Sequence, residues 1–124
     1  MPIPIAIALG GAAGSLARYA VATWVGARVH VGGAGTFAVN IIGALAIGLV
    51  LGTVESRFPA TPRWVTLGLT TGILGGFTTF SAFAYDAVGH VEAGNPTQAA
   101  VYVAGTVVLG IAAAAGGLAL GRSL

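Results

Sequence analysis

Long apolar stretches alternate with short breaks along the whole chain. The stretches run from about Ile3 to Val25, Thr36 to Val54, Trp64 to Val88 and Thr97 to Leu120. A helix needs about 20 predominantly apolar residues to span a bilayer, which is close to the length of each stretch. The pattern therefore predicts an all-α integral membrane protein with four transmembrane helices, residues 1–124 forming a single domain.

The breaks between the stretches are rich in glycine or proline, as tight loops are. They read VHVGGAG from Val29, ESRFPATPR from Glu55 and GHVEAGNP from Gly89. Because these loops are short, the function is expected to lie in the membrane-embedded part. Both histidines, His30 and His90, are predicted to lie in the loops, and neither belongs to a cluster of metal ligands.

Composition supports the membrane prediction and narrows the function. Hydrophobic residues make up 56% of the chain and charged residues 6%, against roughly 25% charged residues in soluble domains. The net charge of +2 is too small for a nucleic-acid surface, and the chain has no cysteine. Nucleotide-binding motifs are absent and no serine has a histidine–aspartate partner set, so an enzyme is not expected. The first stretch lacks the basic start of a signal peptide and is expected to be retained.

The arginines are divided almost evenly between the two sides of the membrane. Four spans place Arg57, Arg63 and Arg122 on one side, and Arg28 with Arg18 on the other. So small a bias gives only a weak preference for one orientation. One hypothesis is that two copies insert in opposite directions and form an antiparallel dimer; the other is a single fixed orientation.

Small residues recur at every fourth position within each stretch. They are Gly10 and Gly14; Ala44, Gly48 and Gly52; Gly68, Gly72 and Gly76; and Ala113, Gly117 and Gly121. Membrane helices use such stripes to approach one another closely, so tight helix packing is the expected role of most of them.

Few polar side chains lie inside the stretches, and each is a candidate for function. Asn40 either bonds a neighbouring helix or lines a pore. Arg18 reaches the headgroups or supplies a positive charge that attracts anions to a vestibule, and both can hold. Glu55 and Asp86 lie near span ends, where we expect them to be solvated. No acidic residue lies at the centre of a stretch, which disfavours proton-coupled transport.

Two further polar residues, Tyr102 and Thr106, are four positions apart and so share a face of the last helix. They form a short hydroxyl track, or Tyr102 is a packing aromatic while Thr106 bonds back to its own helix. Spacing alone leaves both interpretations open.

The sequence GGFTTFSAF, residues 75–83, is poor material for a continuous helix. A break is predicted there, and irregular backbone at membrane depth persists only inside protein or beside a cavity. Freed carbonyls can hold a cation, while Thr78, Thr79 and Ser81 can satisfy freed backbone groups or face a pore. The phenylalanines at positions 77, 80 and 83 form a packing stripe or turn their positive ring edges toward an anion.

Three motifs carry a resemblance to a known family. They are GGAAGSLARY from Gly10, GTFAVNIIGA from Gly35 and TTGILGGFTTFSAF from Thr70. Over essentially its whole length the chain resembles the Fluc (CrcB) fluoride channels. The resemblance implies a multi-pass protein of the cell membrane that exports fluoride passively, as an antiparallel homodimer with two anion pathways.

The resemblance also implies roles for single residues. Backbone carbonyls of Gly75 and Thr78 in both copies would hold one structural sodium ion on the two-fold axis. The fluoride pathway would be lined by Asn40, Phe80, Phe83, Ser81, Tyr102 and Thr106, with Arg18 at its vestibule. Gly110 departs from the family pattern, because some members carry a serine there and so extend the polar track.

Two other classes of protein fit part of the pattern. A small proton-coupled multidrug exporter is also a four-span dual-topology dimer, but it needs a carboxylate in its first helix, where this chain has none. A non-transporting membrane subunit would carry the same small-residue stripes. Such a subunit would not require Asn40, a broken third span and the phenylalanine series together.

Overall fold

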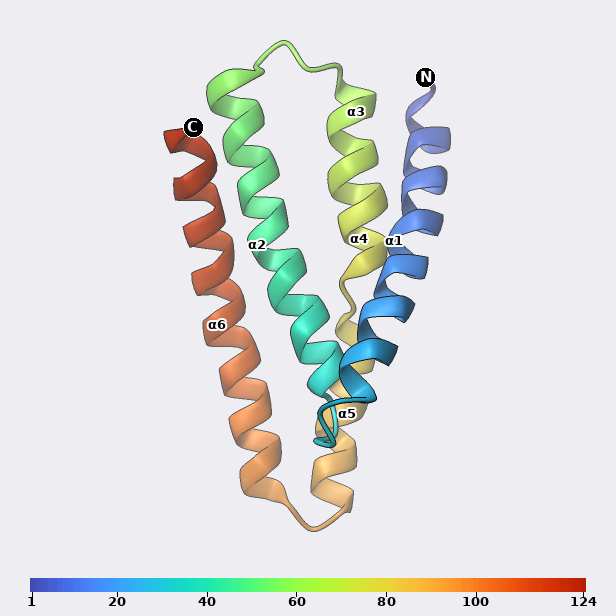
Figure 1. Cartoon of the computed structure of the whole chain (residues 1–124), viewed down its shortest axis with the longest axis vertical. Coiled ribbons are helices and arrows are strands. Elements are labelled where there is room, and N and C mark those ends of the chain that lie inside the picture. Colours follow the sequence, from blue (N-terminus) through green and yellow to red (C-terminus); the bar gives the residue numbers. More distant parts are fainter.

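The computed structural model describes all residues from Met1 to Leu124 and is entirely helical. The elements are α1 (Ile3–Gly26), α2 (Ala34–Arg57), α3 (Arg63–Leu67), the π-helical turn η1 (Gly68–Leu74), α4 (Gly75–Phe77), α5 (Phe80–Glu92) and α6 (Pro96–Ser123). The segments from α3 to α5 follow one another along a single, interrupted span (Figure 1). Four helices are therefore long and apolar enough to cross a membrane, as predicted.

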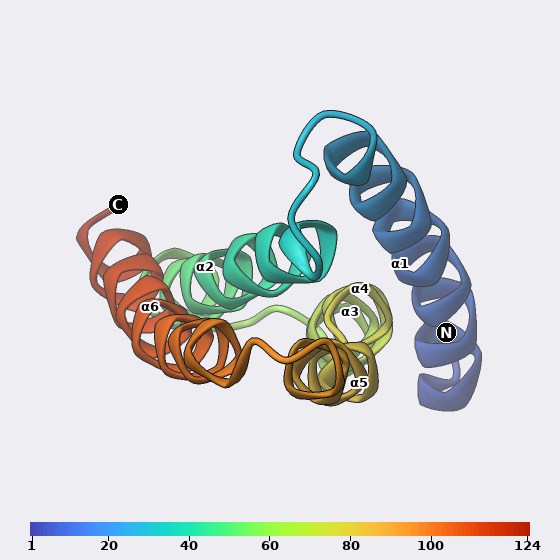
Figure 2. The ribbon, with the colours of Figure 1, turned by 90° about the horizontal axis from the view of Figure 1, so that it is seen from below.

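The spans run alternately up and down (Figure 1). Both termini and the α2–α3 connection lie at one end, and the α1–α2 and α5–α6 connections lie at the other. Viewed along the bundle, α2 and α6 lie side by side, while α1 lies on the far side of the third span (Figure 2). This topology confirms that Arg57, Arg63 and Arg122 share one end of the molecule.

Small residues bring the helices together in two pairs, α2 with α6 and α1 with the third span. A Cβ atom on Gly117 would lie 2.9 Å from the backbone nitrogen of Leu49, and one on Gly10 would lie 2.9 Å from that of Ile73. At these positions the backbone of one helix lies where another residue would place its side chain. The prediction that the glycine stripes serve close packing is confirmed.

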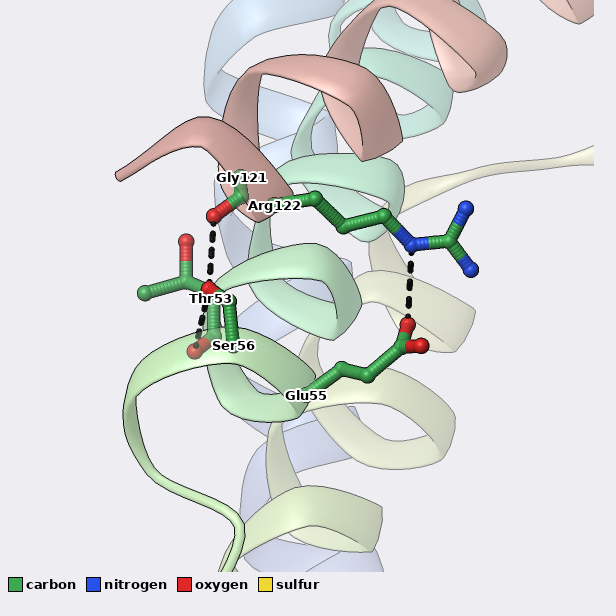
Figure 3. Close-up of polar contacts among 5 residues, drawn as sticks. All are labelled: Thr53, Glu55, Ser56, Gly121 and Arg122. Carbon is green, nitrogen blue, oxygen red and sulfur yellow. Dashed lines mark hydrogen bonds and ion pairs between the residues drawn. The ribbon is translucent and has the colours of Figure 1, made fainter.

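The outer ends of α2 and α6 are also joined by polar contacts (Figure 3). The Ser56 hydroxyl donates to the Gly121 carbonyl at 2.9 Å, and Arg122 Nε pairs with Glu55 Oε2 at 3.0 Å. Glu55 is exposed, as expected, and such a solvent-exposed ion pair contributes at most about 1 kcal/mol. The glycine packing below it is the main contact between the two helices.

The third span is broken within residues 75–83, as predicted, and differs from the sequence prediction in two respects. The break falls at Thr78 and Thr79, which are extended, while the preceding glycine pair stays helical. Gly76 is needed for packing, because a Cβ there would lie 2.6 Å from the Gly11 carbonyl oxygen. The turn η1 is π-helical, which was not predicted.

The end of the third span is the other difference. Helix α5 continues to Glu92, so the prediction that His90 lies in a loop was wrong. The chain reverses only at Gly94, whose φ of +81° suits glycine, before Pro96 begins α6. His90 is buried in the helix rather than exposed in a connection.

Adjacent glycines in α6 provide a test of the packing. Gly117→Ala places a methyl group against the backbone of α2 and is expected to cost about 1–3 kcal/mol of stability. Gly116→Ala is the matched control, since a Cβ at Gly116 meets nothing within 4 Å. Thermal melting of the purified protein should show a lower midpoint for Gly117→Ala only; equal midpoints would contradict the packing.

Candidate functional site

A cavity of about 380 Å³ lies beside the break in the third span. It is lined by polar and backbone groups from α2, the third span and α6, and by apolar side chains. The residues are Asn40, Gly43, Ala44, Ile47, Thr70, Leu74, Gly75, Thr78, Thr79, Phe80, Phe83, Thr106 and Val107. The cavity thus gathers most of the site residues that the sequence predicted.

Asn40 holds the break by bonding both backbone groups of Thr79. Its Nδ2 donates to the Thr79 carbonyl at 2.9 Å, and its Oδ1 accepts from the Thr79 N–H at 2.8 Å. The amide of Asn40 therefore replaces bonds that a continuous helix would make within itself. Because an amide has a second N–H and a second lone pair, Asn40 also presents a free donor at the cavity. The prediction that Asn40 bonds a neighbouring helix is confirmed, and its place at the cavity leaves the pore-lining interpretation a prediction.

Threonine side chains stabilise the two helix ends that meet at the break. Thr78 Oγ1 donates to the Leu74 carbonyl at 3.1 Å, which stabilises the end of α4, just before the break. Thr79 Oγ1 accepts from the Ala82 N–H at 3.2 Å and caps α5. Ser81 is exposed, lies 3.3 Å from Thr79 through its hydroxyl, and does not line the cavity.

The break also releases backbone carbonyls beside the cavity. In a continuous helix the Thr79 N–H would donate to the Gly75 carbonyl, but here it donates to Asn40. No backbone N–H donates to the Thr78 carbonyl. Both residues line the cavity. Carbonyl oxygens freed in this way are groups that can coordinate a monovalent cation.

The phenylalanine series is divided by the break. Phe77 lies before it and is buried, with 7% exposure, while Phe80 and Phe83 follow it and line the cavity. The Phe80 and Phe83 ring centroids are 5.8 Å apart and tilted by 52°, and Phe80 is 79% exposed. The three rings therefore do not share one packing stripe, because the extended backbone at the break changes the helical register; the other interpretation, ring edges facing an anion, stays a prediction.

Thr106 and Tyr102 lie at different points relative to the cavity. Thr106 Oγ1 lines it, is buried and has no hydrogen-bond partner, so the interpretation that it bonds back to its own helix was wrong. Tyr102 packs against Phe83 with centroids 5.3 Å apart, outside the cavity lining. Its hydroxyl donates to Asp86 at 3.3 Å. Asp86 is accordingly half-buried and bonded, not simply solvated as expected.

Arg18 lies in a second cavity of about 310 Å³, together with Ser15, Tyr19, Thr36 and Thr79. It has no acidic residue within ion-pair distance. The structure does not bring Arg18 together with Phe80 and Phe83, but Thr79 lines both cavities. The break thus lies between a cavity lined by Arg18 and one lined by the rings of Phe80 and Phe83.

One residue of the site, Thr70, has a role that the sequence did not assign, whereas the Thr79 cap agrees with the expectation that its side chain satisfies a freed backbone group. Thr70 lines the cavity and donates to the Thr66 carbonyl at 2.8 Å. The position of Thr79, just before a run of helix-forming residues, is typical of an N-cap and could have indicated its role.

Comparison with known proteins identifies the family. The model of the family described as "CrcB-like protein, Camphor Resistance (CrcB)" matches residues 5–118. The chain belongs to the CrcB-like family. It is 45% identical over 122 residues to the "Fluoride-specific ion channel FluC" of Agrobacterium fabrum, covering 95% of this chain and 94% of that one. The protein of the same name from Chloroflexus aurantiacus is 42% identical over 119 residues, with the same coverage.

Membership of the CrcB-like family confirms three predictions. The resemblance stated from the motifs was correct. The relatives described above are ion channels by name, which supports the prediction that the chain is a transporter rather than an enzyme. Four apolar spans in a relative of ion channels make it a multi-pass protein of the cell membrane.

Two substitutions test whether a cavity side chain that has hydrogen-bond partners contributes more to stability than one that has none. Asn40→Asp sets a carboxylate oxygen against the Thr79 carbonyl, where both groups only accept, and should cost about 1–3 kcal/mol of stability. Thr106→Val removes a hydroxyl without a partner and should leave the melting midpoint unchanged or higher. A wild-type midpoint for Asn40→Asp, or an equal loss for Thr106→Val, would contradict the assigned bonding.

Proposed function

We propose that this chain forms a fluoride-specific channel that exports fluoride passively from the cytoplasm and so reduces fluoride toxicity. The observation that carries the proposal is the broken third span, which joins a free amide donor, a free hydroxyl and two phenyl rings at one cavity. The names of the relatives support fluoride as the ion. No acidic residue lies mid-span, which favours passive flow over proton coupling.

The cavity suits a small anion that must lose much of its hydration shell. Fluoride holds water strongly, so a wide, loosely basic pore would favour chloride instead. A narrow path can replace water with close donors, here the free Asn40 N–H and the Thr106 hydroxyl. The rings of Phe80 and Phe83 present positive edges, which attract an anion while excluding water.

The rest of the proposed pathway lies on either side of this cavity. Tyr102 extends the polar track past Phe83, and Ser81 lies at the start of α5. Arg18 would supply the vestibule charge that raises the local anion concentration. Gly110 offers no side chain one turn beyond Thr106, so the track of hydroxyls ends at Thr106.

The proposed assembly is an antiparallel homodimer with two fluoride pathways. Phe80 is 79% exposed on the face that carries the cavity, and Gly75 is exposed beside it. A second copy in the opposite orientation would cover these groups and complete each pathway. The near balance of arginines between the two ends supports insertion in both orientations.

The carbonyls of Gly75 and Thr78 would meet their counterparts on the two-fold axis and hold one sodium ion. The donor set fits, because the Thr78 oxygen accepts no backbone hydrogen bond and the Gly75 oxygen has lost its helical donor. A bound sodium supplies a fixed positive charge at the dimer axis. The ion is structural in this proposal and does not travel with fluoride.

Fluoride efflux from liposomes that contain only this protein tests the function. With a fluoride electrode, the wild type should release fluoride but not chloride, without ATP or a proton gradient. Phe80→Ile and Phe83→Ile should each lower the fluoride rate by about tenfold or more, because the ring edges are lost. Phe58→Ile, at an exposed ring in the α2–α3 loop, is the control. Release that needs a proton gradient, no release at all, or full rates in both cavity variants would contradict the proposal.

Mass and melting measurements in two salts test the assembly. Light scattering on the purified protein in sodium chloride should give the mass of two chains, because the cavity face is otherwise uncovered. Replacing sodium with potassium should lower the melting midpoint, since the carbonyl site loses its ion. The mass of a single chain would contradict the dimer, and identical melting curves in the two salts would contradict the sodium site.

A further inference from the structure

His90 is unusual for its surroundings near the end of α5. It is 8% exposed, while its neighbours Val88, Gly89, Val91 and Glu92 are all exposed. Its Nε2 lies 2.8 Å from the Gly32 carbonyl oxygen, 58 positions away in the α1–α2 loop. A carbonyl only accepts, so Nε2 carries the proton and donates it. The buried ring therefore ties α5 to a loop from the other half of the chain.

The His90 ring is the hydrogen-bond donor that reaches the Gly32 carbonyl. No backbone N–H donates to the Gly32 carbonyl, so His90 provides its hydrogen bond. A Cβ on Gly32 would lie 3.2 Å from His90 Cε1, which shows how closely the loop backbone covers the imidazole. The contact thus depends on both the ring and its bond.

The same loop lies against Tyr102. A Cβ on Gly33 would lie 2.8 Å from two ring carbons of Tyr102, and its φ of +85° also suits glycine. His90 contacts Tyr102 edge-on, with centroids 5.6 Å apart. Phe83 packs on the tyrosine ring and Asp86 accepts from its hydroxyl. The ring of Tyr102 is therefore enclosed by side chains of α5, His90 among them, and by the α1–α2 loop at Gly33.

We infer that His90 is a positioning residue for conduction, which holds the loop of residues 27–33 against Tyr102 and so fixes the phenol at the end of the anion pathway. The inference rests on the proposed function for its effect on flux, but the contact itself does not. If the loop were mobile, the Tyr102 ring could move away from Phe83 and Asp86. Its hydroxyl would then no longer have a fixed position at the end of the proposed anion pathway.

Substitutions of His90 distinguish the effect of its hydrogen bond to Gly32 from the effect of its ring packing. His90→Phe keeps an aromatic ring beside Tyr102 but removes the donor, and should lower fluoride efflux by about five- to tenfold, the effect of one hydrogen bond. His90→Gln retains a donor N–H at a similar reach and should stay within about twofold of wild type on the same reasoning. His30→Phe, the same change at an exposed histidine of the loop, is the control.

A double substitution shows whether His90 acts through Tyr102. In a Tyr102→Phe background, which lacks the phenol hydroxyl, His90→Phe should lower efflux by less than about twofold, because coupled residues are not additive. Wild-type efflux in His90→Phe, no rescue by His90→Gln, or an undiminished loss in the Tyr102→Phe background would each overturn the inference.

Amide hydrogen exchange separates this inference from the proposed function. Residues 27–33 should exchange faster in His90→Phe than in wild type or His90→Gln, whether or not the protein conducts. If wild-type liposomes release no fluoride, the proposed function fails, and faster loop exchange still supports the contact. Unchanged loop exchange in His90→Phe overturns the role of His90 in holding the loop.

Discussion

The paired hydrogen bonds between Asn40 and the Thr79 backbone are the interaction on which the site depends. A broken helix inside a membrane leaves backbone groups that water cannot satisfy, at a cost of several kcal/mol each. Asn40, on the neighbouring helix α2, forms hydrogen bonds of 2.8 Å with the Thr79 N–H and 2.9 Å with the Thr79 carbonyl, so neither group is left unsatisfied. Because the Thr79 N–H is used in this way, the Gly75 carbonyl loses its helical donor, while the Ala82 N–H that would reach the Thr78 carbonyl donates to Thr79 Oγ1 instead. Helix α5 then begins with Phe80 and Phe83 in a new register.

Close helix packing makes that interaction possible. The span before the break lies directly against α1 at Gly10 and Gly76, where no larger residue fits without displacing the backbone. On the other side, α2 is fixed against α6 at Gly117, so Asn40 and Thr106 approach the same cavity from two helices. The glycines therefore have an indirect role in the proposed function: their close packing places the few polar groups around one cavity.

Residue patterns predicted what depends on local sequence and missed what depends on distant contacts. Apolar length defines a span, so the four helices and a weakness in the third were predictable. The place of the break within residues 75–83 was predictable too, but not that Gly76 stays helical, packed against Gly11, while Thr78 and Thr79 are extended. Spacing could not show that Asn40 bonds a residue 39 positions away, that Thr106 lacks a partner, or that His90 is buried by a loop. The ion identities came from the family motifs.

Amide exchange at Thr79 tests whether Asn40 holds the break in the third span. In the wild type, the Thr79 N–H should exchange as slowly as the amides of the flanking helices, because Asn40 accepts its hydrogen bond. In Asn40→Leu, which fills the same space without an acceptor, the Thr79 N–H should exchange much faster. Equal exchange rates at Thr79 in the two proteins would show that Asn40 does not hold the break.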